Sequence, residues 1–131
     1  MNRMDGKICV VTGATQGLGA AIARRLAAAG AKGVVITGRN AERGAKVARG
    51  IIDSHGVPVT FLQADFRQVE DCRRVIAETD RLFGRVDVLV NAGASTARGT
   101  ILDTTPETFD DLFATNVRGP YFLMQEAIRL M

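Results

Sequence analysis

Residues 7–30, KICVVTGATQGLGAAIARRLAAAG, constrain the fold of this chain more than any other stretch. Residues 8–11 are apolar and mostly β-branched, which is typical of a buried parallel strand. Residues 12–19 contain three glycines and predict a tight turn. The residues that then recur at helical spacing, with the glycine that ends the predicted helix, are Leu18, Ile22, Leu26, Ala29 and Gly30. This order of strand, glycine turn and helix predicts the first unit of an α/β fold.

The glycine turn, T-G-A-T-Q-G-L-G, has the composition of an anion cradle. Glycines let the backbone approach a diphosphate closely, and the N–H groups and positive end of the following helix attract its charge. The spacing G-x-x-x-G-x-G differs from the common pattern G-x-G-x-x-G, and no Gly-Lys-Ser/Thr follows it, as a triphosphate-binding loop would require. The turn therefore predicts a diphosphate site, the alternative being a structural turn without a ligand.

The rest of the chain alternates predicted strands and helices. Strands are expected at residues 33–37, 57–63 and 86–90, and helices at residues 41–54, 69–83 and 109–131. Asn40 and Thr105 are the expected caps of two of these helices, and Pro58 favours an edge position for the third strand. The alternation predicts one α/β domain over residues 1–131, a doubly wound parallel sheet of strand order 3-2-1-4. Its ligand crevice would lie between strands one and four.

Apolar periodicity also predicts which faces are buried. The fourth strand is almost wholly apolar, so we expect it to be covered on both faces. The inner face of the helix at residues 41–54 is expected to comprise Val47, Ala48, Ile51 and Ile52. That of the next helix is expected to comprise Val69, Cys72, Val75, Ile76, Thr79, Leu82 and Phe83.

Composition argues against several classes of protein. The net charge of +3 comes from scattered basic residues without interleaved aromatics, so no nucleic-acid partner is expected. No apolar run has transmembrane length and the start has no signal-peptide profile, so we expect a cytoplasmic protein without a membrane partner. Cys9 and Cys72 lack metal or redox spacing, so we expect no metal site and interpret both as small core residues.

Four motifs in order resemble the short-chain dehydrogenase/reductase family. The turn at residues 12–19 resembles its T-G-x-x-x-G-x-G motif, and Asp65 its aspartate after the third strand. Residues 91–93, Asn-Ala-Gly, resemble the motif after the fourth strand, and residues 116–119 the family's asparagine-containing helix motif. The resemblance implies a Rossmann-type fold, a nicotinamide dinucleotide, and hydride transfer between a small-molecule alcohol and a carbonyl.

The resemblance also implies which residues form the site. Asp65 would accept a hydrogen bond from the adenine amine, although it also suits a turn-forming aspartate. The expected cofactor-binding residues are Gly13, Thr15, Gln16, Gly17, Leu18, Gly19, Arg39, Asp65, Phe66, Asn91, Ala92 and Gly93.

The residues after the second strand predict which dinucleotide is bound. NAD-specific sites place a carboxylate there, and it repels a 2′-phosphate. Here the position is Gly38, followed by Arg39, whose guanidinium suits a phosphate. We therefore expect NADP(H), with NAD as the second choice, because Gln16 stands where many NADP-preferring relatives carry a second basic residue.

Asn116 is the expected catalytic residue of this chain. Pro120 has no N–H to bond the Asn116 carbonyl, so we expect a kinked helix with that carbonyl freed. The resemblance gives this asparagine the role of holding a water in a proton relay. The alternative is a kink that serves packing alone.

The family's catalytic serine and Tyr-x-x-x-Lys pair have no counterpart in this chain. Its only tyrosine, Tyr121, is followed four residues later by Gln125, and its last lysine is Lys46. We therefore interpret the chain as the cofactor-binding half of a family member, truncated after the fourth strand and its following helix. A non-catalytic dinucleotide-binding module is the first alternative, and a Rossmann-like methyltransferase the second. Such a chain would expose apolar surface, so we expect it to be poorly stable or to form a homo-oligomer.

Overall fold

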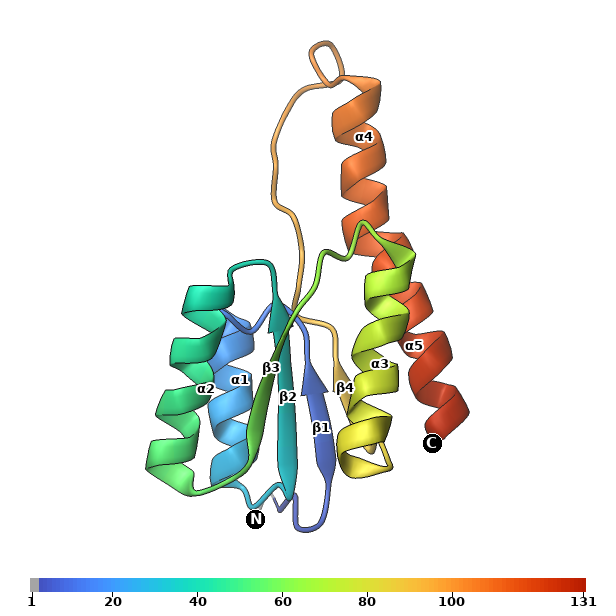
Figure 1. Cartoon of the computed structure of the whole chain (residues 1–131). Helices are drawn as coiled ribbons and strands as arrows, with labels where there is room; N and C mark the ends of the chain where they lie inside the picture. The colour runs from blue at the N-terminus through green and yellow to red at the C-terminus, as the bar shows by residue number, and fades with distance from the viewer. Residues whose placement is uncertain (1–2) are drawn as a thin grey trace.

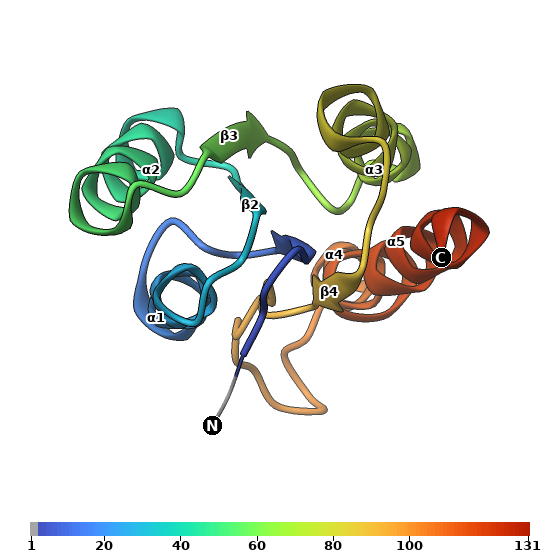
Figure 2. The same cartoon turned by 90° about the horizontal axis from the view of Figure 1, so that it is seen from below.

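The computed structural model describes residues 3–131, and these form a parallel sheet with helices on both faces (Figures 1 and 2). The strands are β1 (Ile8–Val11), β2 (Gly33–Gly38), β3 (Val59–Gln63) and β4 (Val88–Val90). The helices are α1 (Gly17–Ala28), α2 (Ala41–His55), α3 (Val69–Phe83), α4 (Pro106–Phe113) and α5 (Gly119–Leu130), with a π-helical segment η1 (Ala114–Arg118) between α4 and α5. The predicted fold class is confirmed.

The sheet order is β3-β2-β1-β4, as the sequence predicts. The central strand β1 pairs with β2 through Val11 and Ile36, and with β4 through Val11 and Val90. β3 lies at one edge, and Pro58 precedes it and accepts a hydrogen bond from Val34 through its carbonyl. The crevice between β1 and β4 therefore lies where the strand order reverses.

Two separate apolar cores fill the space on either side of the sheet. Helices α1 and α2 cover one face, while α3 and α5 cover the other (Figure 2). Successive side chains of β1 point to opposite faces of the sheet. Cys9 and Val11 therefore belong to the first core, and Val10 belongs to the second. Cys72 also belongs to the second core, so both cysteines are core residues as expected.

The fully buried residues of helix α1 are all small, while Ile22 and Leu26 pack against the first core and are partly buried. Its buried positions are Gly19, Ala20, Ala23 and Ala27, whereas Leu18 is 73% exposed. Leu18 therefore lies outside the core and contributes to the lining of a cavity instead. Glycine and alanine let this helix approach the sheet closely, so the four small residues decide its orientation and the leucine points outward.

The expected inner faces of α2 and α3 are wrong at one position each, and the expected start of β4 is also wrong. Ile52 and Leu82 lie at the flanks of their helices and are exposed, although the other central positions of those faces are buried. β4 begins at Val88 rather than at residue 86 and is half-buried along its length, although Val88 and Val90 pack against the first core and Leu89 against the second, so both of its faces are partly covered as expected. It is an edge strand among the described residues, so no further strand covers its outer side.

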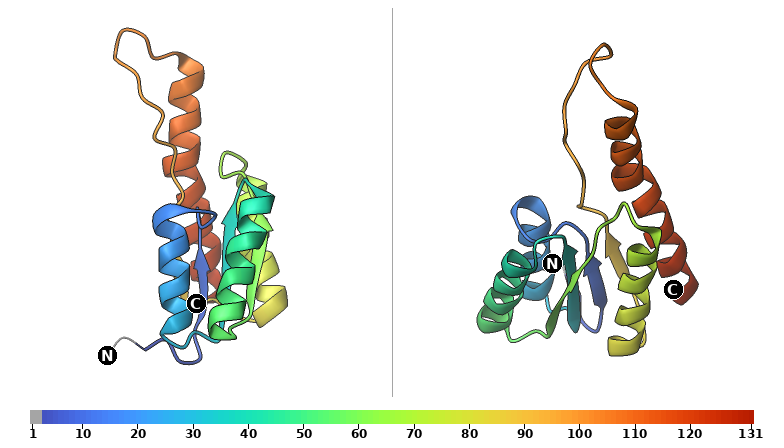
Figure 3. Two further views of the ribbon diagram at one scale, coloured as in Figure 1. Left: turned by 90° about the vertical axis from the view of Figure 1, so that its left-hand side faces the viewer. Right: turned by 45° about the horizontal axis from the view of Figure 1, so that its top comes forward.

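The chain beyond β4 projects past the carboxyl ends of the strands. Figure 3 shows the loop at residues 91–105 and helix α4 rising above the sheet, while α5 returns alongside α3. The Thr105 side chain caps α4 by accepting a hydrogen bond from the Thr108 N–H, as the sequence predicts. The helix expected at residues 109–131, with a kink near Asn116 and Pro120, is divided into α4, η1 and α5. The π-helical segment η1 contains Asn116 and ends directly before Gly119-Pro120.

Candidate functional site

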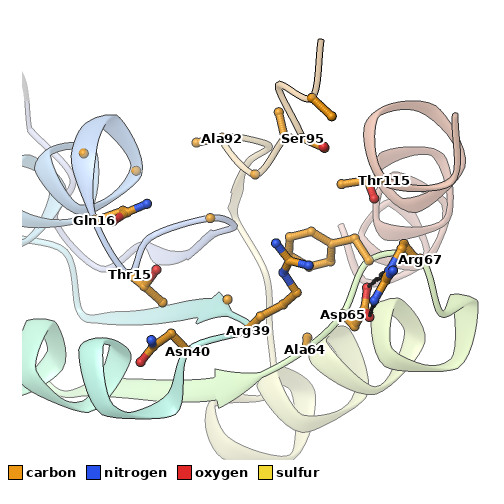
Figure 4. A pocket seen from close by; sticks show the side chains of 18 of the residues that line it. Thr15, Gln16, Arg39, Asn40, Ala64, Asp65, Arg67, Ala92, Ser95 and Thr115 are labelled. Carbon is orange, nitrogen blue, oxygen red and sulfur yellow. Dashed lines mark hydrogen bonds and ion pairs between the residues drawn. The ribbon is translucent and has the colours of Figure 1, made fainter. Parts of the chain in front are cut away.

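A cavity of about 810 Å³ lies at the carboxyl ends of the strands. Its walls come from the turns after β1, β2, β3 and β4 and from helix α4, as Figure 4 shows in part. Cavities that take small molecules and cofactors usually fall between about 300 and 1,000 Å³. It is lined by all the expected cofactor-binding residues except Asn91: Gly13, Thr15, Gln16, Gly17, Leu18, Gly19, Arg39, Asp65, Phe66, Ala92 and Gly93.

Gly13 allows the turn after β1 to touch the turn after β4. Its φ of +61° lies in the left-handed region that favours glycine. A Cβ atom at this position would overlap the Gly93 Cα and lie 2.7 Å from the Gly93 nitrogen. The two backbones therefore meet at the floor of the cavity, and no side chain fits between them.

Helix α1 begins at the cavity and leaves its first N–H groups free of a side-chain cap. A Cβ at Gly19 would lie 2.8 Å from the Gly13 carbonyl carbon, so this glycine lets the helix start directly against the turn. Gln16 is the N-cap residue, and its side chain makes no capping hydrogen bond. The uncapped N–H groups and the positive end of the helix dipole therefore face the cavity, where they suit an anion.

The Thr12 side chain holds the turn after β4 against the end of β1. This role was not predicted from the sequence. Its hydroxyl oxygen accepts hydrogen bonds from the Ala92 and Gly93 N–H groups, each at 3.1 Å. It lies 3.4 Å from the Val90 carbonyl, to which it donates. One buried threonine thus ties β1 to the turn after β4, more than 75 residues away in sequence. Its place as the first residue of the turn was the available signal.

The residue that follows β2 is the cation Arg39, and no carboxylate stands at the end of this strand. A Cβ at Gly38 would lie 2.5 Å from the Thr15 methyl carbon, so a carboxylate here would require Thr15 to move. Figure 4 shows the Arg39 side chain extending from this end of the sheet into the cavity. The Arg39 charge contributes to lowering the pKa of Asp65.

Asp65 and Arg67 form an ion pair on the far wall of the cavity. The Arg67 guanidinium donates to the Asp65 carboxylate at 2.7 Å, and the Arg67 backbone N–H donates at 3.0 Å. The hydrogen bond from the Arg67 side chain is the largest cause that holds the pKa of Asp65 below its ordinary value. Arg67 also lies 3.7 Å from Asp111 of α4, so it links the turn after β3 to that helix.

Phe66 packs into the floor rather than standing free in the cavity. Its side chain is 7% exposed, and a Cβ at Gly93 would lie 2.6 Å from its ring. Its carbonyl oxygen approaches Gly119 so closely that a Cβ there would lie at 2.7 Å. Phe66 thus ties the turn after β3 to β4 and to α5, and the edge of its ring reaches the cavity.

Asn91 and Asn116 lie outside the lining of the cavity. Asn91 is exposed at the end of β4. Asn116 lies in η1, where its side-chain oxygen accepts from the Ser95 N–H at 2.7 Å and its amide donates to the Ser95 carbonyl at 3.0 Å. Ser95 lines the cavity, so Asn116 contacts a lining residue although it does not line the cavity itself.

Several lining residues were not among those expected from the sequence. Asn40 caps α2 by accepting from the Arg43 N–H at 2.9 Å, and the Arg43 guanidinium donates to the Gln16 side chain at 2.9 Å. The remaining ones are Gly38, Ala64, Arg67, Ala94, Ser95, Ala97, Thr108, Asp111, Leu112 and Thr115. Those on α4 carry no local signal, because only the fold brings that helix over the strand ends.

Other chemistries find little support within the part of the chain that the structure describes. Residues 3–131 hold no cluster of three or more histidine, cysteine or acidic side chains that could bind a metal ion. Burial, and secondarily Asp87, raises the pKa of Cys9 to about 11, and burial, together with Asp71, raises that of Cys72 to about 11. Both thiols are therefore protonated at neutral pH. Among the same residues, no helix combines the length and apolar character needed to cross a bilayer.

The sheet order and the glycine turn at its switch point define a domain of the Rossmann type. The family profile of the short chain dehydrogenases matches residues 7–131. The chain belongs to this family.

Individual relatives agree with this assignment. Versicolorin reductase 1 of Aspergillus parasiticus is 40% identical over 130 residues, which cover 99% of this chain and 49% of the relative. A short chain dehydrogenase of Burkholderia cenocepacia, solved in complex with NADP, is 37% identical with a TM-score of 0.94, covering 99% of this chain and 53% of that one. L-sorbose reductase of Gluconobacter frateurii, solved with NADPH and L-sorbose, is 28% identical with a TM-score of 0.95. The match covers 100% of this chain and 50% of that one. The chain thus spans about half the length of the relatives it matches.

Proposed function

We propose that this chain carries the NADP(H) site of a short-chain oxidoreductase that transfers hydride between a small-molecule alcohol and a carbonyl. The observation that carries the proposal is the close packing of the turns after β1 and β4 at Gly13, Gly19 and Gly93, where an added Cβ would overlap neighbouring atoms of the turns or the Phe66 ring. It lies beneath the uncapped start of α1. A pyrophosphate needs this combination of close backbone approach and unpaired N–H groups.

The wall opposite the glycine turn suits the adenosine half of the cofactor. Each carboxylate oxygen of Asp65 has two acceptor positions, so it can accept from an adenine amine while it stays paired with Arg67. Phe66 and the backbone of residues 92–93 would support the other end of the cofactor. Asn91 would act indirectly, by setting the turn that follows β4.

The preference for NADP(H) over NAD(H) rests on the end of β2. Arg39 can pair with a 2′-phosphate, and Gly38 offers no carboxylate to repel it. Two structural relatives of similar fold were solved with the phosphorylated coenzyme, one with NADP and one with NADPH. NAD(H) remains the second choice.

The chemistry of the bound cofactor is hydride exchange at its nicotinamide ring. Asn116 would position the loop of Ser95 beside that ring and hold a water through its carbonyl, next to the missing N–H of Pro120. The chain has no Tyr-x-x-x-Lys pair, so we propose that residues 1–131 alone bind the cofactor without turnover.

The family's proteins act on small molecules, and we propose the same of the protein to which this chain belongs. A homo-oligomer is also proposed, because α4, η1 and α5 expose apolar side chains along one side. A cytoplasmic location stays a prediction from the sequence.

Coenzyme binding tests the proposal directly. Titration calorimetry and NADPH fluorescence should detect binding of NADPH at least tenfold tighter than that of NADH. Arg39→Gln should remove most of this difference and leave NADH binding unchanged, since only the 2′-phosphate contact is lost. Absence of binding to both coenzymes by correctly folded protein would refute the proposal. Oxidation of NADPH by a ketone panel would separate an enzyme from a binding module.

A further inference from the structure

Three contacts hold the turn after β3 against the segment α4-η1-α5. The Arg118 guanidinium donates from Nη2 to the Arg67 carbonyl at 2.7 Å, across 51 positions of sequence. The Arg67 guanidinium in turn lies 3.7 Å from the Asp111 carboxylate of α4. A Cβ at Gly119 would lie 2.7 Å from the Phe66 carbonyl oxygen, so the two backbones also meet directly. The turn and the helical segment are therefore joined at three separate points.

The Arg118 side chain is committed to this turn rather than to a carboxylate. It is the exposed last residue of η1, and no ion pair involving it occurs among residues 3–131. The bond to the Arg67 carbonyl has a charged donor, and such hydrogen bonds are stronger than those between neutral groups. The position of the end of η1 therefore depends on the position of the turn after β3.

The same short segment η1 also holds the loop after β4. Asn116, two residues before Arg118, bonds both the N–H and the carbonyl of Ser95, at 2.7 Å and 3.0 Å. Asp65, at the turn after β3, and Ser95 belong to different parts of the cavity wall (Figure 4). One π-helical segment, a feature that often occurs at functional sites, thus bonds two walls of the cavity from behind.

We propose that Arg118 is a positioning residue that couples the adenosine end of the coenzyme site to Asn116 and the Ser95 loop. The inference rests on the proposed function, which assigns the adenosine half to the wall at Asp65. A ligand that binds only the closed turn opposes every local opening that disrupts this turn. Because Arg118 joins the turn to η1, the Ser95 loop opens together with the turn. The adenosine half thus helps to fix Asn116 without touching it.

Hydrogen exchange of the Ser95 amide with and without 5′-AMP tests the proposal. This ligand lacks the nicotinamide half, so it probes the adenosine end alone. At a free concentration about ten times its dissociation constant for each protein, 5′-AMP should slow the exchange roughly tenfold in wild type. In Arg118→Gln the slowing should fall below about twofold, because the loop then opens without the turn. The dissociation constant of 5′-AMP, measured by calorimetry, should change by less than about threefold.

Arg129→Gln is the matched control. Arg129 is exposed on α5, about three turns beyond Arg118, and its guanidinium pairs with Glu126 at 2.9 Å. The substitution removes the same charge from the same segment, so the slowing by 5′-AMP should persist. Arg118→Lys keeps a cationic donor for the Arg67 carbonyl and should retain at least about threefold slowing. A lysine variant without any slowing would contradict the proposal.

The ratio of exchange rates separates coupling from a purely structural role. If Arg118→Gln speeds the exchange equally with and without 5′-AMP, the ratio stays at its wild-type value and the proposal is refuted. The same result is expected if the Phe66 ring, which packs against Gly93, transmits the effect instead. If wild-type protein binds 5′-AMP without any slowing at Ser95, the proposal fails and the coenzyme site stands. If the folded protein binds neither 5′-AMP nor a coenzyme, both proposals fail.

Discussion

At the scale of single residues, the site depends on positions where a side chain is missing. Gly13 adopts a left-handed conformation and touches Gly93, so two turns far apart in sequence share one surface. No other residue type offers both the conformation and the space. The backbone approach is thus determined by one glycine.

Gly13→Ala should therefore destabilise the fold and abolish coenzyme binding. The left-handed backbone alone costs an alanine about 1–3 kcal/mol, and the overlap with Gly93 adds to this. Urea denaturation measures the loss. Gly50→Ala in α2 is the control, since nothing lies within 4 Å of its added Cβ and alanine should stabilise that helix by roughly 0.5–1 kcal/mol. Equal effects of the two substitutions would contradict this explanation.

A second prediction at this scale concerns Arg67, which keeps the pKa of Asp65 below its ordinary value. A carboxyl group with a depressed folded pKa stabilises the fold above its unfolded pKa of about 3.9, and this contribution is lost as the pH falls through the folded pKa. Arg67→Gln should thus lower the free energy of unfolding at pH 6 and have progressively less effect toward pH 2. Urea titrations across this range measure the difference.

Arg98→Gln in the exposed loop after β4 controls for the loss of one positive charge. It should shift the stability curve by a similar small amount at every pH. If the curve of Arg67→Gln runs parallel to that of wild type down to pH 2, the pair with Asp65 does not stabilise the fold.

At the scale of elements, the segment α4-η1-α5 connects the cavity to the second core. Leu123 and Ala127 of α5 are buried beside α3, while Thr108 and Asp111 of α4 line the cavity. The π-helical segment η1 lies between the part of the chain that lines the cavity and the part that packs in the core. It is close to Pro120, which has no N–H to donate to the helix. The geometry of this turn places Asn116 beside the loop after β4.

Asn116→Ala should loosen that loop without unfolding the helix. The substitution removes both hydrogen bonds to the Ser95 backbone, so the Ser95 amide should exchange with deuterium at least tenfold faster. Asn116→Asp keeps the acceptor for the Ser95 N–H and loses only the donor, so its exchange should fall between wild type and alanine. Unchanged protection in Asn116→Ala would show that other contacts hold the loop.

At the scale of the whole molecule, one side of the long helical segment remains without cover among the described residues. Residues three or four apart are neighbours on a helix surface, and large exposed side chains recur at this spacing. They are Phe109, Phe113, Val117, Tyr121, Met124 and Ile128. Phe109 and Phe113 stack with their ring centroids 4.6 Å apart, which adds a flat aromatic surface. An apolar stripe of this kind is typical of an interface.

We therefore expect the purified protein to self-associate through this stripe. Static light scattering should give a mass above that of one chain, and Phe113→Lys should shift the equilibrium toward the monomer by at least tenfold, since it places a charge in the stripe. Leu102→Lys is the control, because Leu102 is equally apolar and 94% exposed but lies in the loop away from the helix. A well-folded wild-type monomer at high concentration would contradict the prediction.

Periodicity and turn chemistry in the sequence determined the order of the strands and the place of the cavity. The expected strand order follows from alternating elements and right-handed crossovers, and the glycine turn, Arg39 and Asp65 all reach the cavity because they directly follow strands. A strand or a turn depends on residues that are adjacent in sequence, so a short stretch of sequence is enough to predict it. In α1 the fully buried positions are Gly19 and three alanines, whereas Leu18 of its apolar pattern is exposed.

Only the tertiary structure decided which distant residues meet. The pairs Thr12 with Gly93, Arg43 with Gln16, and Asn116 with Ser95 are separated by 81, 27 and 21 positions. No local pattern contains information about such pairs, because each depends on where two turns or helices are placed by the packed sheet. The sequence thus determined the elements and the location of the site, while packing determined the partners of the side chains within it.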